Sequence, residues 1–341
     1  MPLDQQLSGI RGILDVGHPE ACTALSDAAA GAGATVIRGV GKVAVTAGSR
    51  PVVRYEVDEV EHEVSCRLIA GADGRQSGVR RQLGIQLEQT PPRSLGGGLL
   101  VDNLHPWPAN TSSIGTEGDI LYFVFPRPGG IARLYILHDV TQRNRFAGPN
   151  ARSDFLTAFQ LRCIPGSDMF ARARPASTCC AFYPMNDSWT ERPFTEGAVL
   201  LGDAAGWSDP IVGQGTSVAL RDARIVWETL RSGADWSPRA FEPYRQERRE
   251  RMRRLRLAGV VRSEMHLTFT PDGRRRRMAY RDLAARDPVV AGTRLVTYRG
   301  PDGVPDQSFE PETIERILAP RLTGPTPAEP LERPLKLHER R

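Results

Sequence analysis

The sequence predicts a mixed α/β protein with two domains, and three observations support this prediction. A chain of 341 residues with ordinary apolar and charged content is long enough to bury a sizeable core and would usually form two domains. Two segments have the pattern of a strand that ends in a Gly-Asp turn and continues into a helix. Between them, after Pro91-Pro92, lies a strand-rich stretch that predicts a separate antiparallel sheet.

The first part of the chain is expected to hold one helix and a meander of strands. Pro19 is tolerated in the first turn of a helix that covers residues 21–30 and ends at Gly31. Alternating apolar residues at close spacing then predict antiparallel strands. We expect these strands at Thr35–Arg38, Lys42–Thr46, Val52–Val57 and Glu63–Ala70.

The first Gly-Asp turn lies within residues 67–81. An apolar run ends at Asp73-Gly74, and Ser77 can cap the helix that follows, because a serine hydroxyl accepts hydrogen bonds from free first-turn amides. Glycine in such a turn lets the backbone approach a ligand closely. Taken alone, Asp73 could instead be a turn residue whose side chain bonds the nearby backbone.

The second Gly-Asp turn is the most informative feature of the sequence. An apolar run ends at Gly202-Asp203, and the loop at 213–215, Gly-Gln-Gly, precedes a helix predicted over residues 216–230. The first amides of a helix and the positive end of its dipole favour electron-rich or anionic groups. Either turn alone could be an ordinary corner between a strand and a helix. Together, 130 residues apart and in this order, they indicate one ligand site.

The stretch between the two turns contains the candidates for a substrate pocket. His105 and His138 could act as acid–base groups, although a lone histidine at the end of a strand is usually incidental. The aromatic run at 182–185 could line a pocket, but such residues more often pack in a core. Strands are expected at Leu99–Val101, Ile120–Phe125 and Ile131–Leu137, and a short helix at Ser153–Cys163.

With both turns in place, the chain resembles the flavin-dependent monooxygenases of the aromatic hydroxylase type, the family of p-hydroxybenzoate hydroxylase. In that family an Asp-Gly motif lies beside the cofactor pyrophosphate, a later Gly-Asp motif binds the ribityl chain, and the Gly-x-Gly after it touches the isoalloxazine ring. The resemblance covers about residues 17–256. It assigns cofactor binding to Val43, Asp73, Gly74, Arg75, Arg80, Gly202, Asp203, Pro210, Gly213, Gln214 and Gly215.

Three of these assignments have an alternative in the sequence. Val43 stands where the family places a backbone contact to adenine, but a valine in a strand is more often plain core. Arg75 and Arg80 could bind the phosphates of the nicotinamide donor through bidentate contacts. Arginines at the start of a helix are equally often solvated surface charges.

The resemblance also implies an architecture and a chemistry. It predicts an FAD-binding domain of the p-hydroxybenzoate hydroxylase type, truncated at its N-terminus and discontinuous over residues 1–90 and 187–265. A substrate domain at 91–186, a C-terminal extension at 266–319 and an unstructured tail at 320–341 complete the chain. Members of the family use NADH or NADPH and O2 to oxygenate an aromatic or polycyclic small molecule through a flavin hydroperoxide. The sequence identifies no catalytic acid or base and no metal site.

One departure from the family pattern leaves two interpretations open. Such enzymes begin with a βαβ unit whose Gly-x-Gly-x-x-Gly cradles the dinucleotide pyrophosphate, and the sequence contains no such unit. Either the sequence is a truncated or misassigned reading frame of a normal enzyme, or the protein is a shortened remnant that binds flavin weakly or not at all and acts through protein contacts. The missing strand would leave part of the ADP site and one sheet edge open.

Charge and composition limit the partners. Residues 238–281 hold 14 arginines and 5 acidic residues, so the formal net charge of +5 is a local feature. Acidic residues interrupt this run and no aromatic residues alternate with it to stack bases, so we expect a solvated helix over 240–264 and no nucleic-acid binding. No apolar run approaches the ~20 residues of a membrane span. An odd number of cysteines and no signal peptide predict a cytoplasmic protein, and the oligomeric state stays open.

Overall fold

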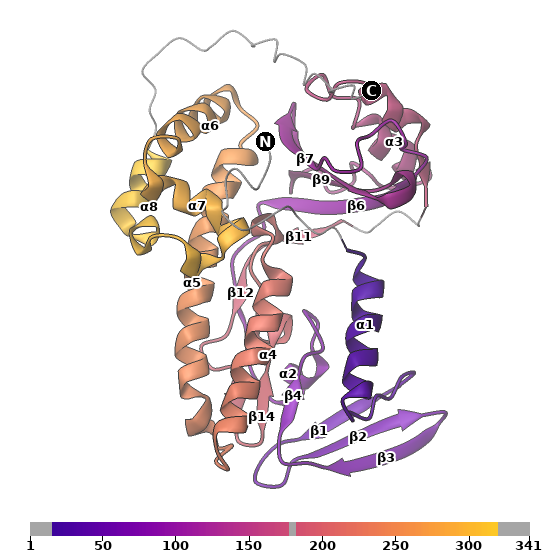
Figure 1. The fold of residues 1–341 in the computed structure, drawn as a ribbon, viewed down its shortest axis with the longest axis vertical. Helices are drawn as coiled ribbons and strands as arrows, with labels where there is room; N and C mark the ends of the chain where they lie inside the picture. The colour runs from indigo at the N-terminus through magenta and orange to yellow at the C-terminus, as the bar shows by residue number, and fades with distance from the viewer. Residues whose placement is uncertain (1–15, 177–181, 320–341) are drawn as a thin grey trace.

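The computed structural model describes residues 16–176 and 182–319. The tail predicted at 320–341 lies outside these residues. A large antiparallel sheet and a group of helices lie side by side at one end of the molecule, and a small strand meander lies at the other (Figure 1). The long helix α5, Glu242–His266, runs from the lower part of the molecule to the helices at the upper end. The two ends of the molecule are therefore connected by one rigid element.

The N-terminal part contains the helix and the meander predicted from the sequence. Helix α1, His18–Gly31, carries proline in its first turn. Strands β1 (Val43–Thr46), β2 (Val52–Val57) and β3 (Val60–Ser65) pair antiparallel in that order. The strand expected at Thr35–Arg38 is wrong, because this segment has no ladder partner among the described residues. Alternation alone cannot supply the neighbouring strand that a ladder requires.

The strand expected at Glu63–Ala70 is divided between two sheets. Strand β3 ends at Ser65, and the chain re-enters a sheet as β4, Ile69–Gly71. This second sheet has the order β13 (Phe194–Thr195), β14 (Ala198–Leu200), β4, with β14 parallel to β4. Among the described residues β4 has no neighbour on its other side, so one edge of this sheet is unpaired.

The large sheet is antiparallel and has six strands. One face of it forms the main core with α3, Ala151–Thr157, where Leu99, Leu134 and Phe155 are fully buried. Strand β7 was missed in the sequence because it is short and only one of its five residues is a large apolar one. The strands are β6 (Ser94–Asp102), β7 (Ser113–Glu117), β8 (Ile120–Arg127), β9 (Ile131–Asp139), β10 (Arg174–Pro175) and β11 (Tyr183–Met185), in the order β10-β6-β9-β8-β7 with β11 also on β6.

Two short strands connect this sheet with the parallel strands β4 and β14. Strand β5, Glu88–Gln89, leads into the large sheet, and β12, Ser188–Trp189, leads back out of it. The two pair antiparallel, with Ser188 opposite Gln89. The sheet is thus inserted between β4 and β14 in the sequence while these two strands remain neighbours in space.

Helices cover the parallel strands and continue beyond them. Helix α2, Gly78–Gln82, follows β4, and α4, Gly215–Ser232, agrees with the predicted helix. The stretch with mixed patterns forms α6 (Pro271–Ala284), α7 (Pro288–Arg299) and α8 (Pro311–Leu318). The expectation that the arginines of α5 are all solvated is wrong, since Arg248 and Arg251 are 3% and 5% exposed.

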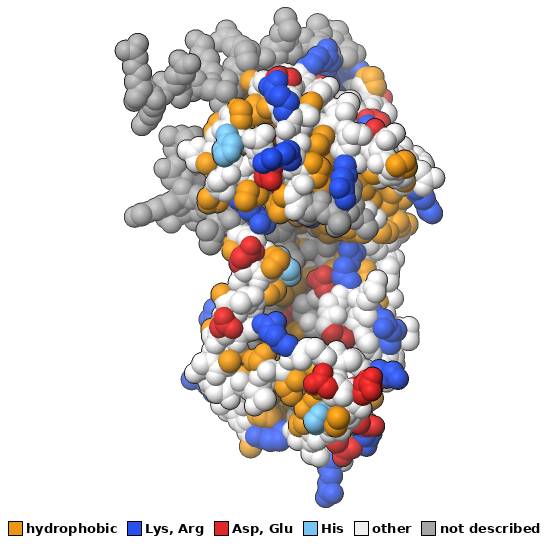
Figure 2. All heavy atoms as spheres, turned by 90° about the vertical axis from the view of Figure 1, so that its right-hand side faces the viewer, with side chains coloured by type: hydrophobic (Ala, Val, Ile, Leu, Met, Phe, Trp, Pro, Cys, Tyr) orange, Lys and Arg blue, Asp and Glu red, His pale blue; other side chains and the backbone are white. Residues whose placement is uncertain are grey.

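The surface has a mixed character. On the face shown in Figure 2, acidic and basic side chains alternate over the lower part of the molecule, and the molecule narrows between its upper and lower parts. Within the described ranges, none of the helices combines the length and the apolar character needed to span a bilayer.

Candidate cofactor site

The two Gly-Asp turns lie at the same edge of one sheet. Strands β4 and β14 are parallel neighbours, with Leu200 opposite Gly71, so their carboxyl ends meet. Asp73 follows the first strand and Asp203 the second. Arg80 joins the two turns, because its guanidinium donates to the carbonyl of Ala204 at 3.1 Å. The fold therefore brings together two motifs that are 130 residues apart in the sequence.

The Asp73 carboxylate is engaged by its own turn. It accepts a hydrogen bond from the Ser77 hydroxyl and another from the amide of Val79 at 3.0 Å. Partial burial raises the pKa of Asp73, but these hydrogen bonds outweigh burial and hold the pKa below its ordinary value. Ser77 also accepts from the amide of Arg80 at 2.9 Å, which confirms the predicted helix cap. Within the chain Asp73 acts as a turn residue.

The Asp203 carboxylate has the opposite environment. It is partly buried, and none of the residues in the described ranges donates a hydrogen bond to it. Burial raises the pKa of Asp203, while the positive charges of Arg75 and Arg248 oppose the rise. Oxygens that leave bulk water need donors. This carboxylate is therefore suited to accept hydrogen bonds from the hydroxyl groups of a ligand.

A buried ion-pair network holds the backbone around Asp203. The fully buried Asp222 of α4 accepts from the amide of Gly202 at 2.9 Å, and from Arg248 and Arg251 at 2.9 and 2.6 Å. Arg248 also donates to the carbonyls of Gly202 and Gly206, each at 2.9 Å. Gly202 has φ of +55°, a conformation that glycine adopts without strain. These hydrogen bonds therefore hold the backbone of the loop that carries Asp203.

Sequence reasoning missed this network. One local signal was available, since Val218, Asp222 and Val226 recur every four residues on the buried face of α4. A carboxylate on an apolar stripe needs a buried cation or donors. The two arginines that supply them lie 26 and 29 residues further along the chain.

The N-terminus of α4 lies beside the Asp203 turn. Gly202 packs against Ala219, and a Cβ on this glycine would come within 3.2 Å of the Ala219 Cβ. Within the part of the chain that the structure describes, no side chain caps α4, and the first turn of this helix carries no acidic residue. Gly213, with φ of +73°, and Gly215 are exposed on either side of the cap residue. The first amides of α4 are therefore open to an electron-rich group.

The loop before α4 is fastened to α7 on its other side. The buried Gln214 side chain donates to the carbonyl of Thr297 at 2.9 Å, and the Thr297 hydroxyl donates to the carbonyl of Val212 at 2.9 Å. The Gln214 amide group thus serves the packing of the loop, and what this residue offers a ligand is its backbone. Pro210 is exposed at the start of the 3-10 turn that leads into this loop.

The two arginines of the first turn have different surroundings. The Arg75 guanidinium lies 4.3 Å from the ring centroid of Trp207 and donates to Asn186 at 3.3 Å. Arg80 is buried and donates to the carbonyls of Ala204 and Arg75, so the solvated alternative is wrong for Arg80. Arg75 is the more accessible of the two. Trp207 was not singled out in the sequence.

Val43 lies apart from the core. Its side chain is 42% exposed, so the alternative of a plain core valine is wrong. Its carbonyl accepts from the Gln82 side chain at 3.1 Å, and Gln82 also accepts from the amide of Val45 at 2.8 Å. The α2 helix that begins at the first turn is in this way bound to strand β1.

The substrate-pocket candidates divide into core and surface. His138 is 1% exposed and its ring lies 5.1 Å from that of Phe182, while burial holds the pKa of His138 below its ordinary value. Phe182 and Met185 pack into two cores, as the sequence favoured. His105 and Tyr183 are exposed. His138 is therefore a neutral core histidine.

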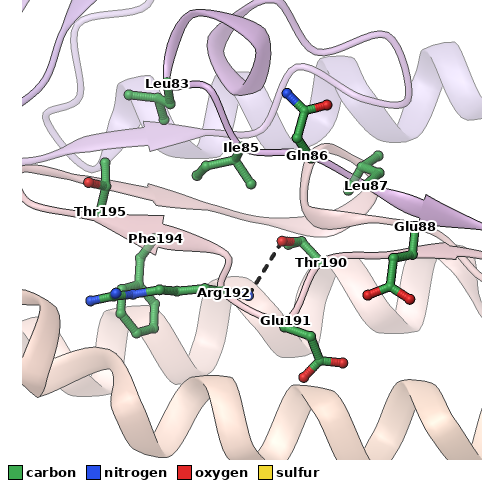
Figure 3. A pocket seen from close by; sticks show the side chains of 10 residues that line it. All are labelled: Leu83, Ile85, Gln86, Leu87, Glu88, Thr190, Glu191, Arg192, Phe194 and Thr195. Carbon is green, nitrogen blue, oxygen red and sulfur yellow. Dashed lines mark hydrogen bonds between the residues drawn. The ribbon is translucent and has the colours of Figure 1, made fainter.

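A cavity of about 500 Å³ lies away from the predicted residues. It opens between the segment after α2 and the segment that joins β12 to β13, with the Arg192 side chain along the ring of Phe194 (Figure 3). Its walls carry no predicted cofactor residue. They are formed by Leu83, Ile85, Gln86, Leu87, Glu88, Thr190, Glu191, Arg192, Phe194 and Thr195.

The site can be compared with known proteins. A family model described as "FAD binding domain" matches residues 2–256. The chain belongs to this FAD-binding family. It is 24% identical over 196 residues to the FAD-dependent monooxygenase ankC of Aspergillus thermomutatus, a match that covers 55% of this chain and 32% of that protein. The chain thus spans about a third of the length of this curated relative.

Solved structures share the fold of this FAD-binding protein. The aromatic hydroxylase CabE from angucycline biosynthesis superposes with a TM-score of 0.66 at 21% identity, over 85% of this chain and 58% of that one. The flavin-dependent brominase Bmp2 gives 0.68 at 18% identity, over 89% and 76%. The anhydrotetracycline hydroxylase OxyS of Streptomyces rimosus gives 0.61 at 20%, over 83% and 56%. The predicted resemblance and fold class are confirmed.

Proposed function

We propose that this protein is an FAD-dependent monooxygenase that uses NADH or NADPH and O2 to oxygenate an aromatic or polycyclic small molecule. One observation carries the proposal: a free, partly buried carboxylate, Asp203, lies beside the open N-terminus of α4 at the carboxyl edge of two parallel strands. The family match supports FAD as the ligand of this edge. The names of the monooxygenase ankC and of the hydroxylases CabE and OxyS support the reaction class.

The residues at this edge fit the parts of FAD. Asp203 would accept from the ribityl hydroxyls, and the backbone amides from Gly213 to Gly215 would face the electron-rich edge of the ring. A helix N-terminus stabilises negative charge on such a group by about 0.3–1 kcal/mol, and by up to ~2 kcal/mol where it is partly buried. Gly202 and Pro210 would shape the loop around it. Gly74 and Val43 would line the pyrophosphate and adenine side of the site, and Asp73 and Arg80 would hold the first turn in place there. Arg75 would face the phosphates.

FAD, when bound, supplies the redox chemistry, and the protein supplies binding, orientation and the exclusion of water. The balanced reaction consumes the substrate, O2, NAD(P)H and one proton. It yields the hydroxylated product, water and NAD(P)+. Arg75, which lies above Trp207 and near Asp203, is the residue we expect to attract the phosphates of the electron donor.

The test is FAD binding by the full chain. FAD is titrated into the protein, and binding is measured from the quenching of fluorescence. We expect Asp203→Ala to weaken FAD binding by about 10- to 100-fold, since hydrogen bonds to a charged group are worth ~1.5–3 kcal/mol. Glu228→Ala, which removes an exposed carboxylate from α4, is the matched control and should leave FAD binding unchanged. Circular dichroism verifies that both variants are folded.

Two outcomes would contradict the proposal. Equal FAD affinity in Asp203→Ala and the parent protein would remove Asp203 from the site. A parent protein that stays colourless and gains no flavin on titration would favour the alternative of a non-catalytic remnant. The edge of β4 that has no neighbouring strand among the described residues is the feature that would explain such a loss of flavin binding. With FAD bound, oxidation of NADH or NADPH in the presence of candidate aromatic compounds then tests the reaction.

A further inference from the structure

Three basic side chains lie near the end of α5, and none of them is paired with a carboxylate of the described residues. Arg262 and His266 belong to α5, and Arg277 belongs to α6. Within residues 16–176 and 182–319, no carboxylate forms an ion pair with either of these two arginines. Elsewhere in the basic segment such pairs are the rule. Carboxylates pair there with Arg245, Arg248, Arg249, Arg251, Arg253, Arg254, Arg275, Arg276 and Arg281.

The contacts of these three side chains leave hydrogen-bonding capacity unused. Arg262 donates to the hydroxyl of Thr297, and Arg277 donates to the carbonyl of Met265. Each contact is to a neutral group, so neither cancels a charge. The Nδ1 atom of His266 is buried and has no hydrogen-bond partner. Partly buried guanidinium groups without a counter-ion are costly, and folded proteins pair them or bind an ion.

The electrostatics of the cluster agree with its geometry. Burial, and then the charges of Arg262 and Arg277, lower the pKa of His266 to about 3, so its imidazole is neutral. Burial also lowers the pKa of Arg262 and of Arg277. Tyr298 and Tyr280 oppose the shift of Arg262, Arg294 adds to it, and Arg274 adds to the shift of Arg277. The nearest acidic residues along the two helices are already engaged, since Glu264 pairs with Arg93 and Asp272 with Arg275. An anion would relieve this excess of positive charge.

We propose that Arg262, His266 and Arg277 form a binding site for one anionic group, a carboxylate or a phosphate, of a small molecule. Two guanidinium groups provide charge-assisted donors for the oxygens of this group. The neutral imidazole of His266 provides a third donor in the tautomer that carries its proton on Nδ1. The site is distinct from the Asp203 edge and does not depend on FAD binding.

The surroundings place this site between the large sheet and the helices α5, α6 and α7. The His266 carbonyl accepts from the hydroxyl of Thr116 on β7 at 3.1 Å, so the large sheet borders the cluster. Thr297, which contacts Arg262, also fastens the loop before α4. A small molecule whose anionic group is held here would therefore lie near the loop that leads into α4.

The experiment measures binding of inorganic phosphate and of acetate to the full chain by calorimetry, with sodium chloride at matched ionic strength as the reference. We expect saturable binding of at least one anion. Arg277→Gln and Arg262→Gln should each weaken it by about tenfold or more, the effect of losing one charged hydrogen bond. Arg281→Gln is the matched control, because Arg281 lies on the same helix, is exposed and pairs with Asp282. This control should bind as the parent does.

The thermal shift caused by each anion provides a second readout, and Arg277→Lys keeps the test informative if a glutamine variant fails to fold. Lysine retains the charge but not the fork of donors, so it should retain weakened binding. If only phosphate binds, the site is specific for a phosphate group, and if only acetate binds, it is specific for a carboxylate. If both bind, the site recognises the negatively charged oxygens that the two groups share. Shifts no larger than those in sodium chloride, or equal binding by Arg277→Gln and Arg281→Gln, would overturn the proposal. Neither result would bear on Asp203 or FAD.

Discussion

Asp73 and Asp203 occupy equivalent positions in two similar sequence motifs, but their carboxylates differ in how they are hydrogen-bonded. Each follows the end of a parallel strand and precedes a helix, and both lie at one sheet edge. The Asp73 carboxylate is bonded by its own turn, through Ser77 and Val79. The Asp203 carboxylate receives no hydrogen bond from the described residues, and the network of Asp222 holds the backbone around it instead. The first aspartate completes the fold, and the second remains available to a ligand.

The difference shows how a protein keeps a carboxylate free. A side chain that bonds its own turn rigidifies that turn and loses its acceptors to it. The Asp203 turn is rigid by other means, because Asp222 and Arg248 bind its amide and carbonyl groups. Rigidity and availability are therefore supplied by different residues in the second turn. The predictions below test this division.

The largest effect is expected from Asp222→Ala. It would leave two buried guanidinium groups without their shared carboxylate, and removing one partner of a buried pair typically costs about 3–5 kcal/mol. We expect the free energy of unfolding in urea to fall by this amount. Glu228→Ala, which removes an exposed i,i+4 partner of Arg224, should cost less than about 1 kcal/mol. Similar losses in the two variants would show that the network does not hold the loop.

A smaller effect should separate the two aspartates themselves. Asp73→Ala removes two hydrogen bonds and should lower the free energy of unfolding by about 1–2 kcal/mol, since the site is partly exposed. Asp203→Ala removes no hydrogen bond made by the described residues and relieves the cost of a partly buried charge, so it should leave the free energy of unfolding unchanged or slightly higher. Urea unfolding measures both. If Asp203→Ala proved the more destabilising, Asp203 would be a structural residue and the comparison would fail.

The pH dependence of stability should also differ in sign between the two sites. Because the pKa of Asp73 is lowered in the folded state, its contribution is present above the ordinary pKa and is lost as the pH falls. Because the pKa of Asp203 is raised, the folded state binds its proton more tightly, and this group costs stability as the pH rises past the ordinary value. Asp203→Asn should therefore gain stability relative to the parent as the pH rises past the ordinary carboxyl pKa of about 3.9, whereas Asp73→Asn should lose it.

A loss of similar size to that of Asp73→Ala is expected at the cap of α2. Ser77→Ala removes the acceptor for the amide of Arg80 and the donor to Asp73, and loss of such a cap typically costs about 0.5–2 kcal/mol. Thermal unfolding should detect this loss, and Ser77→Thr should restore most of it. FAD binding should be far less affected than by Asp203→Ala. A loss of FAD binding equal to that of Asp203→Ala would mean that the Asp73 turn contributes as much to the ligand site.

Much of the local structure followed from the sequence. The meander of β1 to β3, the ends of α4 and the Ser77 cap were predicted, because alternation, helical periodicity and capping act over a few neighbouring residues. Two errors in the predicted strands share one cause. The segment at 35–38 alternates like a strand but finds no partner, and the pattern at 63–70 spans two sheets that the chain joins in three dimensions.

The sequence by itself determined that two strands end in Gly-Asp turns and that a helix with an uncapped N-terminus follows the second. Only the tertiary structure decided that these turns meet and that Asp222 is neutralised by Arg248 and Arg251. It also decided that, among the described residues, no carboxylate pairs with Arg262 or Arg277. The physical reason is the separation along the chain over which each preference acts. Turn and cap preferences depend on adjacent backbone groups, whereas the partner of a buried charge is chosen by packing between segments that lie far apart in the chain.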